Sequence, residues 1–238
     1  MDFQDRVALV TGGTGALGSV VVRDLLASGA RVAATYTVET EWQHFTATVS
    51  DSRTRLKGIP VDLTQADEVR SAVQSLQNAH GHIDYLLAIA GGFAPGKIHE
   101  TSEAVWDRML NLNLKTLFSI LRPAIPLMVK QNFGRIITVS SGAILSGAGA
   151  GVAAYAVSKA GVRQLSEVLA EEVRGYNIRV HCLMPGTLDT PANRRAMPNA
   201  DFSQWVSTAE VARLIHGFLL DGADSSLIVP ILRPGLQA

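Results

Sequence analysis

Short runs of almost wholly apolar residues alternate along this chain with longer segments of helical period. The apolar runs that we expect to form strands are residues 7–10, 32–36, 56–61, 86–89, 136–139, 180–183 and 227–231. We expect helices at residues 16–28, 65–79, 103–131, 152–175 and 208–220. Strands without polar alternation are buried on both faces, as in a parallel sheet that helices cover on both sides. The pattern therefore predicts an α/β fold, with one doubly wound domain over residues 1–238 and a mostly parallel sheet of about seven strands.

Prolines modify this pattern in three segments. Pro230 cannot donate a hydrogen bond to a neighbouring strand, so we expect the last strand at an edge of the sheet. Pro123 and Pro126 are expected to bend or interrupt the segment 103–131. Residues 191–207 contain two further prolines among scattered polar residues. We expect this stretch to leave the sheet and to form a substrate lid.

Composition narrows the classes of partner and the location. Lys plus Arg total 21 and Asp plus Glu total 21, and the basic residues cluster only at Arg194–Arg195. A nucleic acid or an anionic membrane needs a basic face, so we expect neither as a partner, and no Cys/His/carboxylate spacing suggests a metal site. Residues 1–6 are too acidic and polar for a secretory signal, and no run approaches the ~20 apolar residues of a membrane span. With Cys182 as its one cysteine, the chain is expected in the cytoplasm.

A glycine-rich turn follows the first strand and opens the first helix. Gly13, Gly15 and Gly18 match the pattern G-x-G-x-x-G. Glycine permits a tight turn with close backbone approach, and the free N–H groups at a helix N-terminus bind a pyrophosphate. This strand–turn–helix context predicts a Rossmann-type dinucleotide site.

The end of the second strand should distinguish NAD from NADP. An NAD enzyme usually has an acidic residue there, which accepts a hydrogen bond from the ribose 2′-hydroxyl. This chain has Tyr36 and Thr37 instead, followed by Glu39 and Glu41. Thr37 could donate to a 2′-phosphate, although no Arg or Lys stands at 14–15 or 36–41 to pair with it. The sequence slightly favours NADP(H) over NAD(H), and Glu39 could reverse the preference.

Tyr155 and Lys159 are four residues apart and should share one face of the helix 152–175. A free tyrosine titrates near pH ~10, and a neighbouring ammonium should lower the pKa of Tyr155. Such a phenol could give a proton to a carbonyl oxygen while hydride reaches the carbon. Ser140 and Ser141 follow a predicted strand and should lie on the same rim of the sheet as the glycine turn. Either hydroxyl could orient the substrate oxygen.

Taken in order, these motifs resemble the short-chain dehydrogenase/reductase family over essentially the whole chain. The matching landmarks are Thr11-Gly12…Gly18, Asp62-Leu63-Thr64, Ala90-Gly91, Asn113-Leu114-Lys115, Ser141, Tyr155…Lys159 and Pro185-Gly186. The resemblance implies an NAD(P)-dependent oxidoreductase that transfers hydride between the nicotinamide and a small carbonyl or alcohol substrate. It also implies a homo-oligomer, with a tetramer ahead of a dimer.

The resemblance further implies a role for each matching residue. Tyr155 would be the general acid/base, and Ser141, or Ser140 as its rival, would steady the substrate oxygen. Lys159 would bind the nicotinamide ribose, and Asn113 would hold a water that relays protons from Lys159. The expected cofactor-binding residues are Gly12, Thr14, Gly15, Ala16, Leu17, Gly18, Tyr36, Thr37, Asp62, Leu63, Ala90, Gly91, Gly92, Tyr155, Lys159, Pro185, Gly186, Leu188 and Thr190.

The chain departs from the family pattern at three places. Ala16 stands where the family usually has its middle glycine, and Ala88-Ile89 replaces two asparagines. Ser141 lies one residue farther from Tyr155 than is customary. None of these departures removes the proton donor.

A narrower likeness leaves other functions open. The glycine turn, residues 90–93 and residues 188–202 are similar to those of dihydropteridine reductases. A dihydropteridine reductase-like enzyme is therefore one alternative, and a dinucleotide-binding sensor or scaffold without turnover is another. Phe93 and Trp205 could form aromatic walls for a planar or apolar substrate, or could simply pack the lid onto the body.

Overall fold

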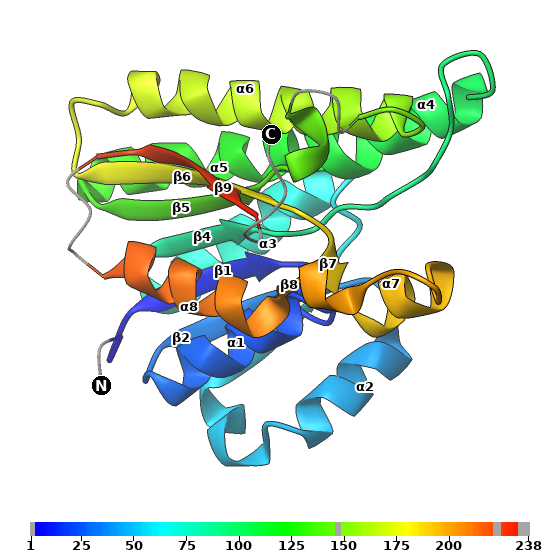
Figure 1. Cartoon of the computed structure of the whole chain (residues 1–238). Helices are drawn as coiled ribbons and strands as arrows, with labels where there is room; N and C mark the ends of the chain where they lie inside the picture. Colours follow the sequence, from blue (N-terminus) through cyan, green and yellow to red (C-terminus); the bar gives the residue numbers. More distant parts are fainter. Residues whose placement is uncertain (1–2, 146–148, 221–224, 233–238) are drawn as a thin grey trace.

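The computed structural model describes residues 3–145, 149–220 and 225–232; residues 1–2 and 233–238 of the predicted domain lie outside the described residues. A seven-stranded sheet has the order β3-β2-β1-β4-β5-β6-β9, and every neighbouring pair is parallel (Figure 1). Its strands are β1 Val7–Thr11, β2 Arg31–Tyr36, β3 Leu56–Pro60, β4 Tyr85–Ala88, β5 Gly134–Val139, β6 Ile178–Pro185 and β9 Leu227–Ile231. The predicted doubly wound α/β fold is confirmed, and Pro230 lies in an edge strand as expected.

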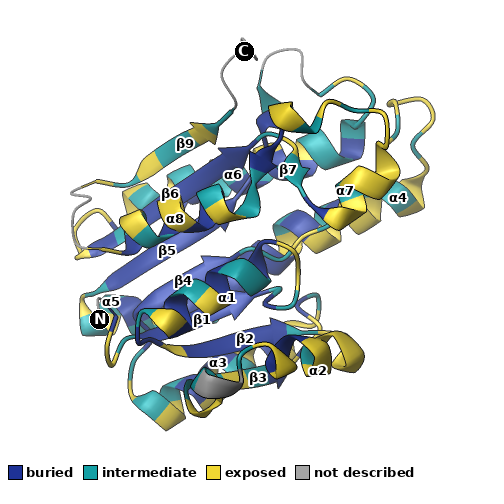
Figure 2. Cartoon of the chain, turned by 60° about the horizontal axis from the view of Figure 1, so that its bottom comes forward, coloured by how far each residue is buried: buried dark blue, intermediate teal, exposed yellow. Residues whose placement is uncertain are grey.

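Helices cover both faces of this sheet, as Figure 2 shows by the buried strands between them. The helices α3 Ala66–His80, α5 Thr116–Gln131 and α6 Ala153–Glu172 share one core cluster, and α1 Gly18–Ala27 and α8 Thr208–Leu219 share the other. Within β1, Val7 and Leu9 belong to the first cluster, and Ala8 and Val10 to the second. Successive residues of a strand point to opposite faces, so a strand between two helix layers needs apolar residues throughout.

The long segment 103–131 is helical throughout but contains one irregular turn. It consists of α4 Glu103–Met109, a π-helical turn at Leu110–Lys115, and α5. Pro123 and Pro126 both lie inside α5, so neither interrupts the helix, and the irregular turn precedes them. A π-helical turn has wider i→i+5 bonding and is frequently found at functional sites.

The same segment also corrects an expectation about membranes. By length and composition alone Glu103–Gln131 could cross a bilayer, whereas the sequence was expected to hold no such stretch. In this fold 44% of its 18-residue apolar window is buried. Leu117, Ile120, Leu121, Ala124 and Met128 of α5 belong to the core cluster on the sheet.

Several short elements were not predicted. They are α2 Glu39–Ala47, α7 Pro191–Ala196, β7 Leu188–Asp189, β8 Val206–Ser207 and the 3₁₀ turns Ser50–Arg55, Gly142–Ile144 and Phe202–Gln204. Residues 191–207 leave the main sheet, as expected, and β8 pairs with β7 in a separate two-stranded sheet.

All seven main strands are parallel, so their carboxyl ends meet at one edge of the sheet. The chain builds outward from β1 through β2 to β3, and then continues at β4 on the other side of β1. Ligands of open α/β sheets bind beyond the carboxyl ends of the strands, at such a switch point. The segments that follow β1, β4, β5 and β6 therefore frame the candidate site.

Candidate active site

The glycine turn between β1 and α1 has a backbone that only glycine fits easily. Gly12 has φ +66°, in the left-handed region. A Cβ atom on Gly18 would lie 2.1 Å from the carbonyl oxygen of Gly12. The turn is tied to β2, because the Gly13 N–H donates to the Thr35 carbonyl at 2.9 Å. The close packing of turn, strand and helix leaves no room for side chains at these positions.

The start of α1 fits a bound pyrophosphate. Leu17, its N-cap residue, makes no side-chain cap, and no acidic residue stands in the first turn. The N–H groups of Ser19, Val20 and Val21 already donate to the carbonyls of Gly15 and Leu17, so at this helix start it is mainly the helix dipole that favours an anion. The residues present therefore suit a dinucleotide at this turn.

Two carboxylates lie at the end of β2, near the glycine turn. The Tyr36 hydroxyl donates to Glu39 Oε2 at 2.8 Å, and this hydrogen bond raises the pKa of Tyr36. The Thr14 hydroxyl of the glycine turn donates to Glu41 Oε2 at 3.2 Å. The Tyr36 ring stacks on Trp42, with ring centroids 4.9 Å apart. Helix α2, absent from the predicted elements, thus brings acidic groups to the place where an adenine ribose is expected.

Asp62 and Leu63 follow β3 on the same edge. Asp62 is exposed, and its Oδ1 accepts hydrogen bonds from the Thr64 N–H at 2.8 Å and the Thr64 hydroxyl at 2.7 Å. These bonds lower the pKa of Asp62, so it is a carboxylate at neutral pH. Leu63 is buried in the core cluster beneath it.

Residues 89–92, after β4, are held by two polar side chains. Thr11 Oγ1 accepts hydrogen bonds from the N–H groups of Ile89 and Ala90, each at 3.0 Å. Asn113 is 2% exposed in the π-helical turn; its Oδ1 accepts from the Gly92 N–H at 2.8 Å, and its Nδ2 donates to the Gly92 carbonyl at 3.1 Å. The loop after β4 is therefore fixed to both β1 and the π-helical turn.

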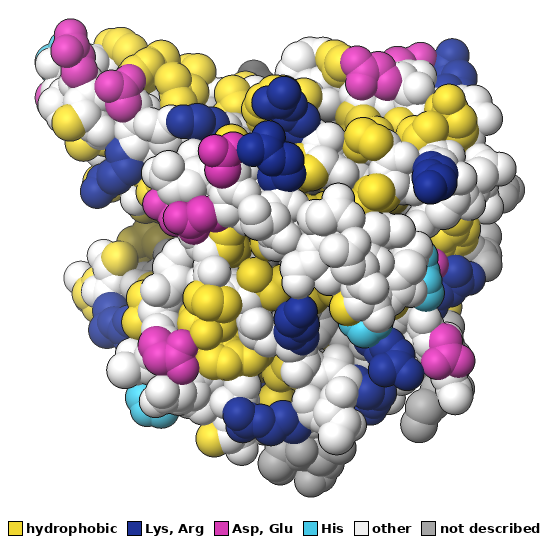
Figure 3. Space-filling view, turned by 180° about the vertical axis from the view of Figure 1, so that it is seen from behind, with side chains coloured by type: hydrophobic (Ala, Val, Ile, Leu, Met, Phe, Trp, Pro, Cys, Tyr) yellow, Lys and Arg dark blue, Asp and Glu magenta, His cyan; other side chains and the backbone are white. Residues whose placement is uncertain are grey.

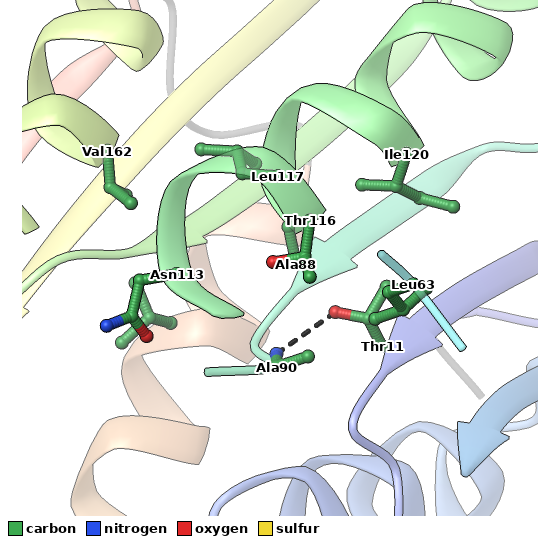
Figure 4. Close-up of a pocket in the computed structure, with 10 residues that line it drawn as sticks. Thr11, Leu63, Ala88, Ala90, Asn113, Thr116, Leu117, Ile120 and Val162 are labelled. Atoms are coloured by element: carbon green, nitrogen blue, oxygen red, sulfur yellow. Dashed lines mark hydrogen bonds between the residues drawn. The ribbon is translucent and has the colours of Figure 1, made fainter. Parts of the chain in front are cut away.

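A small cavity lies behind this loop, where Asn113 and the Thr11–Ala90 hydrogen bond border it (Figure 4). It offers about 10 Å³, enough for roughly one water. Thr11, Asn113 and Thr116 supply its polar side chains, and Leu63 and Val162 are among its apolar ones.

The proposed proton donor lies at the start of α6. Lys159 Nζ is 5.9 Å from the centroid of the Tyr155 ring and donates to the Val139 carbonyl at 2.8 Å. The Ser141 hydroxyl lies close enough to the Tyr155 phenol to lower its pKa. The Ser140 hydroxyl is buried and donates instead to the Lys159 carbonyl at 2.7 Å. The structure thus brings Ser141, Tyr155 and Lys159 together and gives Ser140 a different partner.

The expectation that Lys159 lowers the pKa of Tyr155 is wrong for this structure. Burial raises the pKa of Tyr155, and the hydrogen bond from Ser141 opposes that rise. Burial also lowers the pKa of Lys159 to about 8. The physical reason is that both groups lose water, while Lys159 Nζ is held by the Val139 carbonyl.

Asn113, the fourth predicted catalytic residue, contacts this group through Ser158. Asn113 Nδ2 donates to Ser158 Oγ at 2.9 Å, and the Ser158 hydroxyl donates to the Tyr155 carbonyl at 2.7 Å. Gly91 lies between Asn113 and Lys159, because a Cβ atom on Gly91 would be 2.6 Å from Asn113 Oδ1 and 3.2 Å from Lys159 Nζ. Sequence reasoning gave Ser158 no role, although it lies three residues after Tyr155 on the same helix face.

Residues after β6 border the site on its other side. A Cβ atom on Gly142, which follows Ser141, would be 3.3 Å from the Pro185 carbonyl oxygen and 3.4 Å from Gly186 Cα. Leu188 starts β7, and Thr190 caps α7 by accepting from the Asn193 N–H at 3.1 Å. At the adenosine end, Tyr36 and Thr37 lie at the end of β2, and Asp62 and Leu63 follow β3. Leu63 also borders the small cavity beside Asn113.

The residues that the structure describes offer few other candidates for a binding or catalytic site. Within the described ranges, no group of three or more His, Cys, Asp or Glu side chains could hold a metal ion. The strong features are the glycine turn and the group formed by Asn113, Ser141, Tyr155 and Lys159.

Comparisons with known proteins agree with this geometry. Residues 6–201 match the family model described as short chain dehydrogenase. The acetoacetyl-CoA reductase of an Acinetobacter species is 33% identical over 79% of this chain and 76% of its own length. The 3-oxoacyl-[acyl-carrier-protein] reductase of Thermotoga maritima is 28% identical over 90% of each chain. The crystal structure of gox2181 superposes with a TM-score of 0.89 at 26% identity, over 96% of this chain and 95% of that one.

The match covers most of the chain, and the motifs that carry it line one edge of the sheet. The chain belongs to the short-chain dehydrogenase/reductase family and is an NAD(P)-dependent oxidoreductase that acts on carbonyl or alcohol groups.

Proposed function

We propose that Tyr155 is the general acid/base of this oxidoreductase and that Ser141 orients the substrate oxygen. Two observations carry the proposal: the Ser141 hydroxyl is close enough to the Tyr155 phenol to lower its pKa, and the buried Lys159 amino group lies 5.9 Å from the centroid of the Tyr155 ring. Two hydroxyls that already face each other can both hydrogen-bond one carbonyl oxygen. The Ser140 hydroxyl is bound to the Lys159 carbonyl, which supports Ser141 for this role.

A nicotinamide coenzyme held at the glycine turn would supply a hydride to the carbonyl carbon, or would accept one from the carbinol carbon in the reverse direction. As the C=O π electrons move to oxygen, Tyr155 gives that oxygen its proton and Ser141 donates a hydrogen bond. The raised pKa of Tyr155 keeps the phenol protonated at neutral pH, which suits a proton donor. Lys159, with a pKa of about 8, is mainly protonated at pH 7 and would hold the nicotinamide ribose beside the phenol.

Asn113 has two roles in this proposal. Its side chain fixes Gly92 and Ser158, and so positions the loop after β4 against α6. It also borders the small polar cavity, where a water could pass protons toward Lys159. The glycine turn, Asp62, Leu63, residues 90–92, Pro185, Gly186, Leu188 and Thr190 would hold the dinucleotide.

For the cofactor, we propose a preference for NAD(H), against the slight lean toward NADP(H) from the sequence alone. Glu41 reaches the glycine turn through Thr14, and Glu39 lies beside Tyr36. A 2′-phosphate would meet these carboxylates, with no Lys or Arg at 14–15 or 36–41 to neutralise it. A ribose 2′-hydroxyl could instead donate to Glu41. Replacing Glu41 by Gln should shift the ratio of the NADH and NADPH dissociation constants about ten-fold toward NADPH, and an unchanged ratio would refute the assignment.

The predicted domain, lid, assembly and location are part of the same proposal. We propose one domain over residues 1–238, with residues 191–207 as a lid over the substrate. Leu112, Phe118, Val157 and Val168 are large apolar side chains exposed on the π-helical turn, α5 and α6, which supports pairing with a second copy of the chain. Figure 3 shows hydrophobic side chains across the upper part of the molecule, where these helices lie. The single buried thiol, Cys182, suits a reducing cytoplasm.

Hydride transfer can be tested with reduced coenzyme deuterated at the nicotinamide C4. The enzyme is incubated with a panel of ketones, acetoacetyl-CoA and quinonoid dihydropterin, and the products are analysed by mass spectrometry. The proposal expects deuterium on the carbinol carbon of a reduced ketone or thioester. Reduction of the dihydropterin alone would favour the pterin reductase alternative, and coenzyme binding without turnover of any substrate would favour the sensor.

A further inference from the structure

An exposed aromatic ring lies directly against the proton donor. The Phe93 ring meets the Tyr155 ring edge to face, with centroids 5.0 Å apart and planes at 72°. Phe93 is nevertheless 60% exposed. A single exposed apolar side chain needs no explanation by itself, but this one lies against the Tyr155 ring, where a group attached to the reacting carbonyl would meet it.

The backbone around Phe93 is firmly held, so the ring is presented by the fold. Gly92 makes two hydrogen bonds with Asn113, at 2.8 and 3.1 Å. Ala94 is buried in a small cluster with Met109 and Ala154, against which the Tyr155 side chain also packs. Further along, the Gly96 N–H donates to the Gly151 carbonyl at 2.7 Å, so the loop is also tied to the segment before α6.

We propose that Phe93 selects substrates with a flat, apolar group attached to the reacting carbonyl, such as aryl ketones. This inference rests on the proposed role of Tyr155. The carbonyl oxygen must lie within about 3 Å of the Tyr155 hydroxyl to receive its proton. A ring attached to the carbonyl carbon then lies within reach of the Phe93 ring, where an aromatic pair is favourable.

Charged side chains on the Phe93 loop and on the lid are paired with one another, which favours an uncharged substrate group. On the Phe93 loop, Lys97 Nζ and Glu100 Oε1 pair with each other at 3.4 Å. On the lid, Arg194 binds both carboxylate oxygens of Asp189, at 2.6 and 2.8 Å, and lies over the Phe202 ring. These cations already have partners, so an anionic substrate group would have to compete for them.

The test compares acetophenone, which carries a flat ring, with 2-butanone, which is too small to cover Phe93. Replacing Phe93 by Ala should raise the KM for acetophenone about ten-fold, and change kcat and the KM for 2-butanone less than about two-fold. Ile98→Ala is the matched control, because Ile98 is an apolar residue of the same loop and is 70% exposed. The control should leave both KM values unchanged. Equal KM changes for the two ketones in Phe93→Ala, or none, would overturn the proposal.

A binding measurement separates this inference from the proposed chemistry. Acetophenone is titrated, by saturation-transfer NMR, into Tyr155→Phe with bound coenzyme, and into the same variant that also carries Phe93→Ala. The second variant should bind acetophenone about ten-fold more weakly, and equal binding would overturn the role of Phe93. Failure of the wild-type enzyme to reduce any ketone would instead remove the proposed function, whatever the binding result.

Discussion

Replacing Lys159 by Met should abolish turnover and yet stabilise the folded protein at neutral pH. The Lys159 side chain is 6% exposed, and its amino group donates to the Val139 carbonyl. An ammonium that is buried with so little compensation costs folding free energy. Met has a similar length and no charge, so it removes that cost together with the hydrogen bond.

The size of the effect follows from the pKa of Lys159. A fall from 10.5 in the unfolded chain to about 8 in the fold corresponds to about 3 kcal/mol of lost stability wherever both states are protonated. Loss of the hydrogen bond to Val139 costs Met about 1 kcal/mol. The net gain for Lys159→Met at pH 7 is therefore about 2 kcal/mol.

The stabilisation by Lys159→Met disappears toward high pH. Between about pH 8 and 10.5 the folded protein has lost the Lys159 proton while the unfolded chain keeps it, so the wild-type protein gains stability as pH rises. The difference in unfolding free energy, measured by urea denaturation of both proteins, should shrink from about 2 kcal/mol at pH 7 to near zero at pH 10. A difference that does not change with pH, or a variant that is less stable at pH 7, would refute the reasoning.

Three further predictions concern other buried groups. Ser158→Ala removes the hydroxyl between Asn113 Nδ2 and the Tyr155 carbonyl. The substitution should lower the unfolding free energy by about 1–2 kcal/mol and kcat several-fold, while a fluorescence titration should show unchanged coenzyme affinity. An unchanged kcat would contradict the positioning role of Ser158. Burial lowers the pKa of His181 to about 4, so the unfolded state binds its proton first as pH falls below 6.5. The free energy of unfolding should therefore fall by about 2 kcal/mol between pH 7 and pH 5. Urea denaturation of His181→Phe should show no such fall, and the same fall in the variant would contradict the prediction. Carbonyl reduction should slow as pH rises through about 8, where Lys159 loses its proton; the pH–rate profile of Lys159→Arg should lack this step, and an identical profile would contradict it.

The strands could be predicted because each one lies between two helix layers and needs apolar residues on both faces. Ile136 belongs to one core cluster and Ile137 to the other, and such strands have no polar face. Helix α2 was missed because it buries only Phe45 and Thr46, which is too little to give a clear helical period. It is also the helix that carries Glu41 to the glycine turn, and the proposed preference for NAD(H) rests on this carboxylate.

The sequence could predict which residues form the candidate site, but not how burial shifts their pKa values. The four-residue spacing of Tyr155 and Lys159 predicted that they lie together, as they do. No local pattern indicates that the Val139 carbonyl, from β5, holds Lys159 Nζ, or that Lys159 is buried and Tyr155 half-buried. Ser140 and Ser141 looked equivalent, but neighbouring residues at a strand end point in different directions, toward the Lys159 carbonyl in one case and the Tyr155 phenol in the other.

The most direct test of the whole account compares Tyr155→Phe with the wild-type enzyme in two measurements. Coenzyme binding is followed by quenching of tryptophan fluorescence, to which Trp42 at the adenosine end contributes, and turnover is followed with the best ketone of the panel. The account predicts a dissociation constant within about two-fold of wild type and turnover lower by about 10³-fold. Retained turnover, or binding and turnover lost to the same extent, would contradict the claim that this phenol is the proton donor.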